Sequence, residues 1–212
     1  FETVLKKDLA KAGNEKRFAK DKKFWDDQLD ALGEPLYSDI QGPSVLEEAR
    51  KRHGNPKLRS SDIEMKDLFV AVKDYYLEPG PTKNLIDFCM NHQLSMTNLL
   101  LLGIRTYLSK VNNGQEDITI QNFISRRSTH DEWTSGGSRT IMFPCRTVIT
   151  PETDFLSAAY EIQNMQNRIY MHSNYDPAFI MDEMRKRYNT PEHTGYESCY
   201  LTYQPMTVKV EN

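Results

Sequence analysis

Apolar residues recur at helical spacing over much of the chain. Phe18, Trp25, Leu29 and Leu32 lie seven, four and three positions apart, which predicts one apolar face on a helix over residues 14–32. Gly33 and Pro35 would end this helix. The same reasoning predicts four more helices: from the cap Thr82 through Met90, from the cap Ser95 to about Val111, from the cap Asp154 through Ile169, and from Pro177 through Tyr188. The helix after Ser95 is apolar nearly all round, which is typical of a buried central helix.

Other segments alternate or run apolar in the way strands do. Residues 117–124 alternate at period two and predict a half-buried strand, and residues 140–149 predict a strand that Pro144 confines to a sheet edge or a bulge. Short strands are predicted over residues 68–72 and 198–203, and a polar loop over residues 125–137. Helices and strands therefore alternate, which favours an α/β architecture with helices packed on a mixed sheet.

Composition narrows the class of protein. The 212 residues carry 27 basic and 30 acidic side chains, a net charge of −3, so no electrostatic argument favours nucleic acid as a partner. No apolar run approaches the roughly 18 residues of a membrane span. The chain opens without a methionine or a signal-peptide pattern, and its three cysteines, Cys89, Cys145 and Cys199, are widely spaced. We therefore expect free thiols, a cytoplasmic location and no membrane partner.

We expect a single folded unit that has been excised from a longer chain. Residues 1–33 form a leading helical segment, residues 42–61 a polar surface connection with one or two helical turns, and residues 62–212 the main α/β body.

The sequence contains few patterns that indicate catalysis or metal binding. The five histidines are scattered and there is no His-Glu-x-x-His or Cys-x-x-Cys motif, so we predict no metal site. A Cys–His nucleophilic pair stays open, although each cysteine lies in an apolar element where a thiol remains protonated. His172, near a predicted helix end, is explained by the helix dipole. Arg126 and Arg127 follow a predicted strand and Arg146 lies inside the next one; a surface salt bridge and the pinning of backbone carbonyls are equally compatible with the pattern.

Strand alternation leads to a sharper expectation for the arginine pair. Arg127 should be mostly buried and donate to backbone carbonyls or a carboxylate, because the loop that follows has few apolar anchors. Arg126, on the opposite face, should be exposed.

Several motifs occur together in one order. Phe18 to Trp25 with Leu29, the strand that ends in Arg127, the run from Gly137 to Arg146, His172-Ser-Asn-Tyr175 and the stretch from Gly195 to Gln204 span nearly the whole chain. In this order they resemble the C-terminal half of the condensation domains of nonribosomal peptide synthetases. Two departures stand out: Thr140-Ile141-Met142 replaces the Val-Asn-Thr of the family, and Pro205 replaces its closing Asn.

The resemblance implies one lobe of a chloramphenicol-acetyltransferase-like fold, which forms a tunnel with a second lobe. Carrier proteins would deliver a thioester donor and an amine acceptor on 4'-phosphopantetheine arms, with no other cofactor bound. Partners would be the N-terminal lobe and adjacent synthetase modules. Matching positions put Thr140, Ile141, Thr202 and Gln204 on the tunnel wall and give architectural roles to Trp25, Arg127, Gly137, Arg146, His172 and Tyr175.

The resemblance also implies that this segment has no catalytic residue. The His-His-x-x-x-Asp-Gly motif of the family belongs to the preceding half and is absent from these residues. We therefore expect an acyltransferase segment that is inert alone and that exposes an apolar face toward its partner lobe. Two alternatives are a non-catalytic docking lobe of the same fold and an unrelated α/β binding protein.

Overall fold

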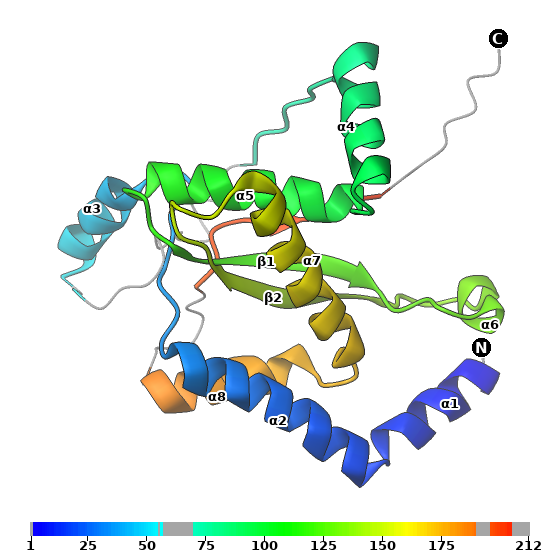
Figure 1. Cartoon of the computed structure of the whole chain (residues 1–212). Coiled ribbons are helices and arrows are strands. Elements are labelled where there is room, and N and C mark those ends of the chain that lie inside the picture. The colour runs from blue at the N-terminus through cyan, green and yellow to red at the C-terminus, as the bar shows by residue number, and fades with distance from the viewer. Residues whose placement is uncertain (1, 55, 57–69, 190–195, 205–212) are drawn as a thin grey trace.

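The computed structural model describes residues 2–54, 56, 70–189 and 196–204. Helices surround a small sheet in this part of the chain (Figure 1). The elements in chain order are α1 (Glu2–Ala12), α2 (Glu15–Leu32), α3 (Pro43–His53), α4 (Pro79–Asn91), α5 (Met96–Val111), β1 (Asp117–Ser125), α6 (His130–Thr134), β2 (Thr140–Val148), α7 (Phe155–Met171), α8 (Pro177–Tyr188) and β3 (Tyr200–Leu201).

The sheet is mixed, and β1 is its middle strand. β1 pairs antiparallel with β2 along nine residues, from Asp117 opposite Val148 to Ser125 opposite Thr140. β3 pairs with β1 in parallel over two residues only, with Leu201 opposite Asn122. β2 is an edge strand among the described residues, so Pro144 lies where its missing N–H is tolerated, as predicted.

The core lies between the sheet and its helices. Ile118 and Ile120 of β1 pack against apolar residues of α5 and α7. At the other end of the strand, Ile124 joins Phe143 of β2 and side chains from α2, α7 and α8. In Figure 1, α5 runs along the upper side of the sheet and α7 crosses in front of it, while α2 and α8 lie together below it. Tyr188 of α8 donates to the carbonyl of Leu29 in α2, 3.0 Å away.

Side-chain caps fix the starts of the long helices; those at Ser95 and Asp154 were predicted, and the one at Asn14 was not. Asn14, Ser95 and Asp154 each accept a hydrogen bond from a backbone N–H of the first turn of α2, α5 and α7. Pro177 occupies the first turn of α8, where its missing N–H costs nothing. The helix boundaries of these four elements therefore agree closely with the sequence prediction.

Three expectations about local structure were wrong. α4 begins before the predicted start at Thr82, because Pro79-Gly80-Pro81 forms its first turn instead of preventing a helix there. The predicted loop over residues 125–137 contains the short helix α6, which Thr129 and Glu132 start with a reciprocal capping box. The predicted strand over residues 198–203 pairs only at Tyr200 and Leu201.

The stretch before α4 also departs from expectation. Part of the strand predicted over residues 68–72 lies outside the described residues, and residues 70–78 form no strand. Instead they present large apolar side chains to solvent, with Tyr76 92% exposed. Residues 42–61 were expected as surface connection, but α3 within them buries Leu46 and Ala49.

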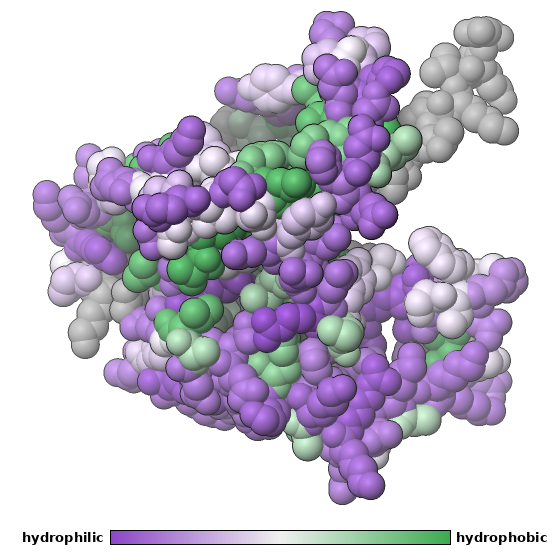
Figure 2. Space-filling model, in the orientation of Figure 1, coloured by the Kyte–Doolittle hydropathy of each residue, from purple (hydrophilic) through white to green (hydrophobic). Residues whose placement is uncertain are grey.

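Apolar side chains are distributed unevenly over the surface. In the space-filling view, they gather around α5 and the start of α7, whereas α2 and α8 are covered largely by hydrophilic residues (Figure 2). Among the described residues, no helix combines the length and apolar character needed to cross a bilayer.

Candidate functional site

The end of β1 lies between the two segments that carry the residues that the resemblance assigned to the tunnel wall. Ser125 and Ile124 pair with Thr140 and Ile141 at the start of β2. On the other side, β3 runs parallel to β1, and the chain leaves it at Leu201, opposite Asn122. Thr202 and Gln204 follow directly after the last paired residue of β3. Segments more than 60 positions apart in sequence therefore flank the same strand, β2 on one side of β1 and β3 on the other.

A polar groove of about 620 Å³ opens at this end, between β1, the beginning of α5, α7 and Tyr203. We call it the amide groove, because two amide pairs line it. Asn122 donates from Nδ2 to Oε1 of Gln166, 2.8 Å away, and Asn98 donates to Oε1 of Gln163, 3.2 Å away. Asn122 and Gln166 are only 2% and 4% exposed. The groove thus offers uncharged donors and acceptors, which suits a ligand that carries amide groups.

A smaller pocket of about 170 Å³ lies beside the groove, at the start of β2. We call it the arginine pocket, and it is lined by Asp8, Arg126, Ser138, Arg139, Thr140 and Ile141. Arg139 makes a two-pronged contact with Asp8, at 2.6 and 3.2 Å, and also reaches Glu132 at 3.2 Å. The expectation that Arg126 is exposed was wrong: its side chain is half-buried. Strand alternation stops applying at Ser125, the last residue of β1, so it does not set the direction of Arg126.

Arg127 anchors the loop that follows β1. Its guanidinium donates to the carbonyl oxygens of Ser135, at 3.0 Å, and Gly137, at 2.6 Å, and to that of Glu132. Gly137 itself has a φ of 90°, a conformation that favours glycine. The contacts are the predicted ones, but Arg127 is half-buried rather than mostly buried.

Glu132 holds the same loop from the other side. Its carboxylate accepts from the backbone N–H of Ser128 at 2.8 Å, from the Ser128 hydroxyl at 2.9 Å and from the N–H of Thr129 at 3.0 Å. These bonds, led by the backbone N–H of Ser128, lower the pKa of Glu132 to about 2. The loop that leads to Thr140 is therefore fixed by an arginine and a carboxylate rather than by apolar packing.

Arg146 joins β2 to the end of α2. It contacts both carboxylate oxygens of Asp117, at 2.8 and 2.5 Å, and donates to the carbonyls of Leu32 at 3.0 Å and Gly33 at 2.7 Å. The last turn of α2 contains no basic residue of its own. Arg146 therefore provides the positive charge that the carbonyl end of that helix favours.

The remaining motif residues form an aromatic cluster between α2, α7 and α8. Trp25 stacks on Phe143, with ring centroids 5.6 Å apart, and Tyr175 packs on Phe18 at 5.3 Å. His172, at the C-terminal end of α7, stacks on a second aromatic ring of α2 and lies 2.8 Å from a carboxylate oxygen of Asp21. These contacts are those of side chains that hold helices together.

The three thiols are poor nucleophiles. Burial raises the pKa of Cys145 to about 11 and raises the pKa values of Cys89 and Cys199 as well. All three are free cysteines. In the part of the chain that the structure describes, no three His, Cys, Asp or Glu side chains are grouped as a metal site would require.

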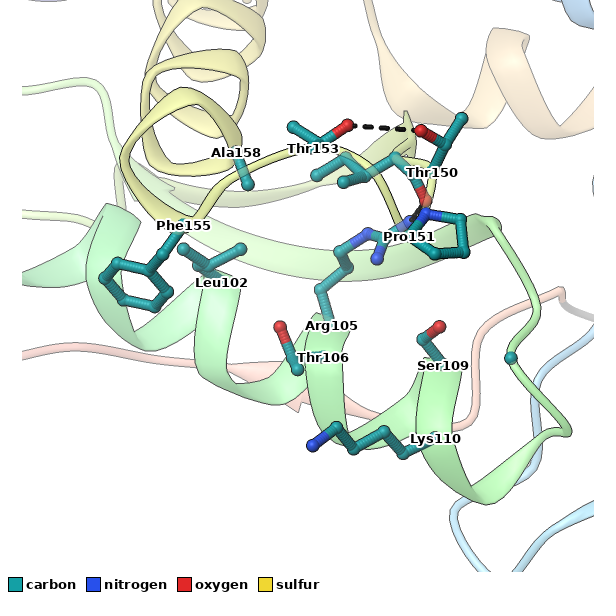
Figure 3. Close-up of a pocket in the computed structure, with 12 residues that line it drawn as sticks. Leu102, Arg105, Thr106, Ser109, Lys110, Thr150, Pro151, Thr153, Phe155 and Ala158 are labelled. Atoms are coloured by element: carbon teal, nitrogen blue, oxygen red, sulfur yellow. Dashed lines mark hydrogen bonds between the residues drawn. The ribbon is translucent and has the colours of Figure 1, made fainter.

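A further cavity of about 380 Å³ lies at the opposite end of the sheet, between α5, the turn after β2 and the start of α7 (Figure 3). Phe155, Leu102 and several hydroxyl-bearing side chains line it, including Thr150 and Thr153, whose hydroxyls are 3.4 Å apart. Arg105 lies there too, but its guanidinium bonds to the carbonyls of Glu116 and Ile149 and so ties α5 to both strands. Neither this cavity nor the amide groove is lined by Thr140, Ile141, Thr202 or Gln204, the residues predicted for the tunnel wall.

Sequence reasoning missed the amide groove and the arginine pocket. Asn122 is the one polar residue among the inward positions of β1, where Ile118, Ile120 and Ile124 are apolar, and that interruption was a usable signal. No comparable signal marks Gln166. It lies on the inward face of α7 among apolar residues, but only the fold shows that this face is buried at that point. The burial of Arg126 depends on α1 and on the turn after α7, which no local pattern connects to it.

Solved structures with the same arrangement define the class of fold. The first condensation domain of the CDA synthetase matches 84% of this chain and 34% of its own length, with a TM-score of 0.63 and 15% sequence identity. VibH, a nonribosomal peptide synthetase condensation enzyme, matches with a TM-score of 0.63 and 12% identity over 89% of this chain and 38% of its own. The fold is thus of the chloramphenicol-acetyltransferase-like α/β class.

Sequence comparison then places the chain in a family. The condensation domain family model matches residues 6–197, so the chain belongs to the condensation domain family. It is also 22% identical over 170 residues to a plipastatin synthase of Bacillus subtilis (strain 168), a match that covers 80% of this chain and 6% of that protein. The chain therefore spans only part of each of these relatives. The alternative of an unrelated α/β binding protein is overturned.

Proposed function

We propose that this chain is the C-terminal lobe of a condensation domain and forms one wall of the tunnel in which an amide bond is made. The observation that supports the proposal is the register around β1: Thr140 and Ile141 pair with the last residues of β1, and β3, which Thr202 follows, lies on its other side. The coverage of the solved relatives, 34% and 38% of their lengths, is consistent with a part of such a domain.

In the proposed reaction, an amine nitrogen attacks the carbonyl carbon of a thioester. The new C–N bond forms, the C–S bond breaks, the thiol of the donor arm leaves, and the amine loses a proton. Condensation of two tethered substrates depends largely on holding them at the right distance and angle. A wall of uncharged amides can do this without a titrating group, and the amide groove fits a phosphopantetheine arm because the arm itself contains amide groups.

The lobe alone is then expected to be inert. None of its described thiols is poised as a nucleophile, since burial raises all three pKa values. The His-His-x-x-x-Asp-Gly motif of the family is absent from the 212 residues. The proposal therefore assigns acid–base chemistry to a preceding N-terminal lobe, and it assigns docking to carrier proteins from adjacent modules in the cytoplasm.

The test is a condensation assay with a carrier protein loaded with an acyl thioester and with an amine acceptor. The chain alone should give no product above background, and the chain together with the segment that precedes it in its gene should give product. Turnover by the chain alone would overturn the half-domain assignment. A preceding segment with a degraded His-His-x-x-x-Asp-Gly motif and no turnover would favour the second candidate, a non-catalytic docking lobe of the same fold.

A further inference from the structure

The cationic side chains around the arginine pocket are not equally neutralised. Arg139 is 10% exposed in its side chain and its charge is paired with two carboxylates, because Asp8 and Glu132 both contact it within 3.2 Å. Asp21, the carboxylate of the adjoining helix, is engaged by His172 at 2.8 Å and by Arg17 at 3.9 Å. The acidic groups near the pocket therefore already have cationic partners.

Arg126 has no such partner. Among the described residues, no carboxylate oxygen lies within 4 Å of its guanidinium, and its side-chain hydrogen bond goes to the neutral amide of Asn174, 3.3 Å away. Burial, and next the positive charge of Arg139, lower the pKa of Arg126 from its ordinary value. A desolvated guanidinium without a counterion is costly, and an anion that reaches it relieves that cost.

The surroundings of Arg126 suit a small oxyanion. The guanidinium presents planar paired donors that match carboxylate and phosphate oxygens. Ser138 and Thr140 add hydroxyl donors to the same pocket, and Ile141 provides an apolar wall. The pocket holds about 170 Å³, which is enough for one such group and not for a whole aminoacyl arm.

We propose that the arginine pocket binds an oxyanion through Arg126, either a carboxylate on the substrate or a phosphate on its arm. The identity of that anion rests on the proposed function, since it depends on Thr140 and Ile141 facing the tunnel. Arg126 would act as a specificity-determining residue: it would favour substrates or arms that present an anion at the start of β2.

Binding can be measured without catalysis. We would titrate the chain with succinate and, separately, with inorganic phosphate, and follow the arginine Nε–Hε signals by NMR. The signal of Arg126 should shift saturably with at least one probe, and Arg126→Gln should weaken that binding about tenfold or more. Arg126→Lys, which keeps the charge, should retain part of it. Lys20→Gln removes an exposed positive charge and serves as the matched control.

Equal affinity in Arg126→Gln and Lys20→Gln, or no saturable shift of the Arg126 signal, would overturn the inference. Far-ultraviolet circular dichroism establishes that each variant is folded, and Arg126→Lys carries the test if Arg126→Gln is not. If the chain binds a probe but the chain joined to its preceding segment does not, a carboxylate of the rest of the protein occupies the pocket, and the inference is again overturned.

Condensation by the longer protein then distinguishes the two sources of the anion. If Arg126→Gln lowers kcat/KM for an aspartyl substrate and leaves the asparaginyl analogue unchanged, the anion is a substrate carboxylate. If Arg126→Gln instead raises KM for the carrier-borne arm equally with both substrates, the anion is the phosphate. If Arg126→Gln leaves condensation unaffected, this inference alone is overturned. If the wild type gives no condensation at all, the proposed function is overturned.

Discussion

Replacing Arg146 should strongly destabilise the junction between the sheet and α2. Arg146→Met keeps most of the apolar stem but removes the bonds to Asp117 and to the carbonyls of Leu32 and Gly33. The side chains of Arg146 and Asp117 are 11% and 16% exposed, so the substitution leaves a largely buried carboxylate without its partner.

The magnitude follows from these contacts. Breaking a buried ion pair by removing one partner costs about 3–5 kcal/mol, and the lower end applies because Asp117 retains some access to water. Loss of the positive charge at the end of α2 adds roughly 0.3–1 kcal/mol. We therefore expect a loss of about 3–4 kcal/mol in the free energy of unfolding. At about 2–4 °C per kcal/mol for a chain of this size, Tm should fall by roughly 6–16 °C.

The assay is urea unfolding followed by the fluorescence of Trp25, which is buried against Phe143 and reports on the same junction. Asp117→Asn and the double variant complete a cycle. Because the two side chains touch, the double variant should lose less than the sum of the single losses by about 1–2 kcal/mol. A loss under about 1 kcal/mol for Arg146→Met, or strict additivity, would refute the reasoning that this arginine acts through Asp117 and the helix end.

Three further outcomes are expected. Arg127→Ala should lower the free energy of unfolding by about 2 kcal/mol in urea melts, because three carbonyls lose their donor and water satisfies them only in part. Arg127→Lys should lower it less. A loss below about 0.5 kcal/mol for Arg127→Ala would contradict the anchoring role. Since the pKa of Glu132 is lowered to about 2 from an ordinary 4.5, its stabilising contribution is complete above about pH 4.5 and is lost as the pH falls toward 2. Glu132→Gln should therefore lose less stability than the wild type between pH 5 and pH 3, and equal losses would count against this. A variant that keeps only Cys145 should react with a thiol reagent no faster than the protein unfolds, because burial raises the pKa of that thiol to about 11; rapid labelling in native buffer would show that the site is open.

Local signals predicted the long elements well and the irregular ones poorly. The spacing of apolar residues was enough for α2, and spacing with the caps Ser95 and Asp154 was enough for α5 and α7, because capping and amphipathic packing are properties of neighbouring residues. The capping box of α6, Thr129 with Glu132, was also present in the sequence. A helix of five residues is too short to show the apolar spacing by which the longer helices were predicted.

The site was predictable only in part. The family resemblance selected Thr140, Ile141, Thr202 and Gln204, and strand register shows that the segments that carry them flank β1 on opposite sides; their place on a tunnel wall stays a prediction. The environment of Arg126 was not predictable, since Asp8 of α1 and Asn174 after α7 reach it only through the tertiary fold. Alternation along a strand says nothing about side chains once the strand has ended.

The unequal pairing on the two sides of β1 has a mechanical consequence. Thr140 and Ile141 belong to a nine-residue ladder, whereas Thr202 to Gln204 follow a ladder of only two residues. Local opening is easiest where few backbone hydrogen bonds must break together. We therefore expect amide hydrogens near Tyr200 to exchange much faster than those in the middle of β2. One half of the candidate tunnel wall would be stiff and would set a reference position, and the other would be compliant and could adjust to the width of what passes.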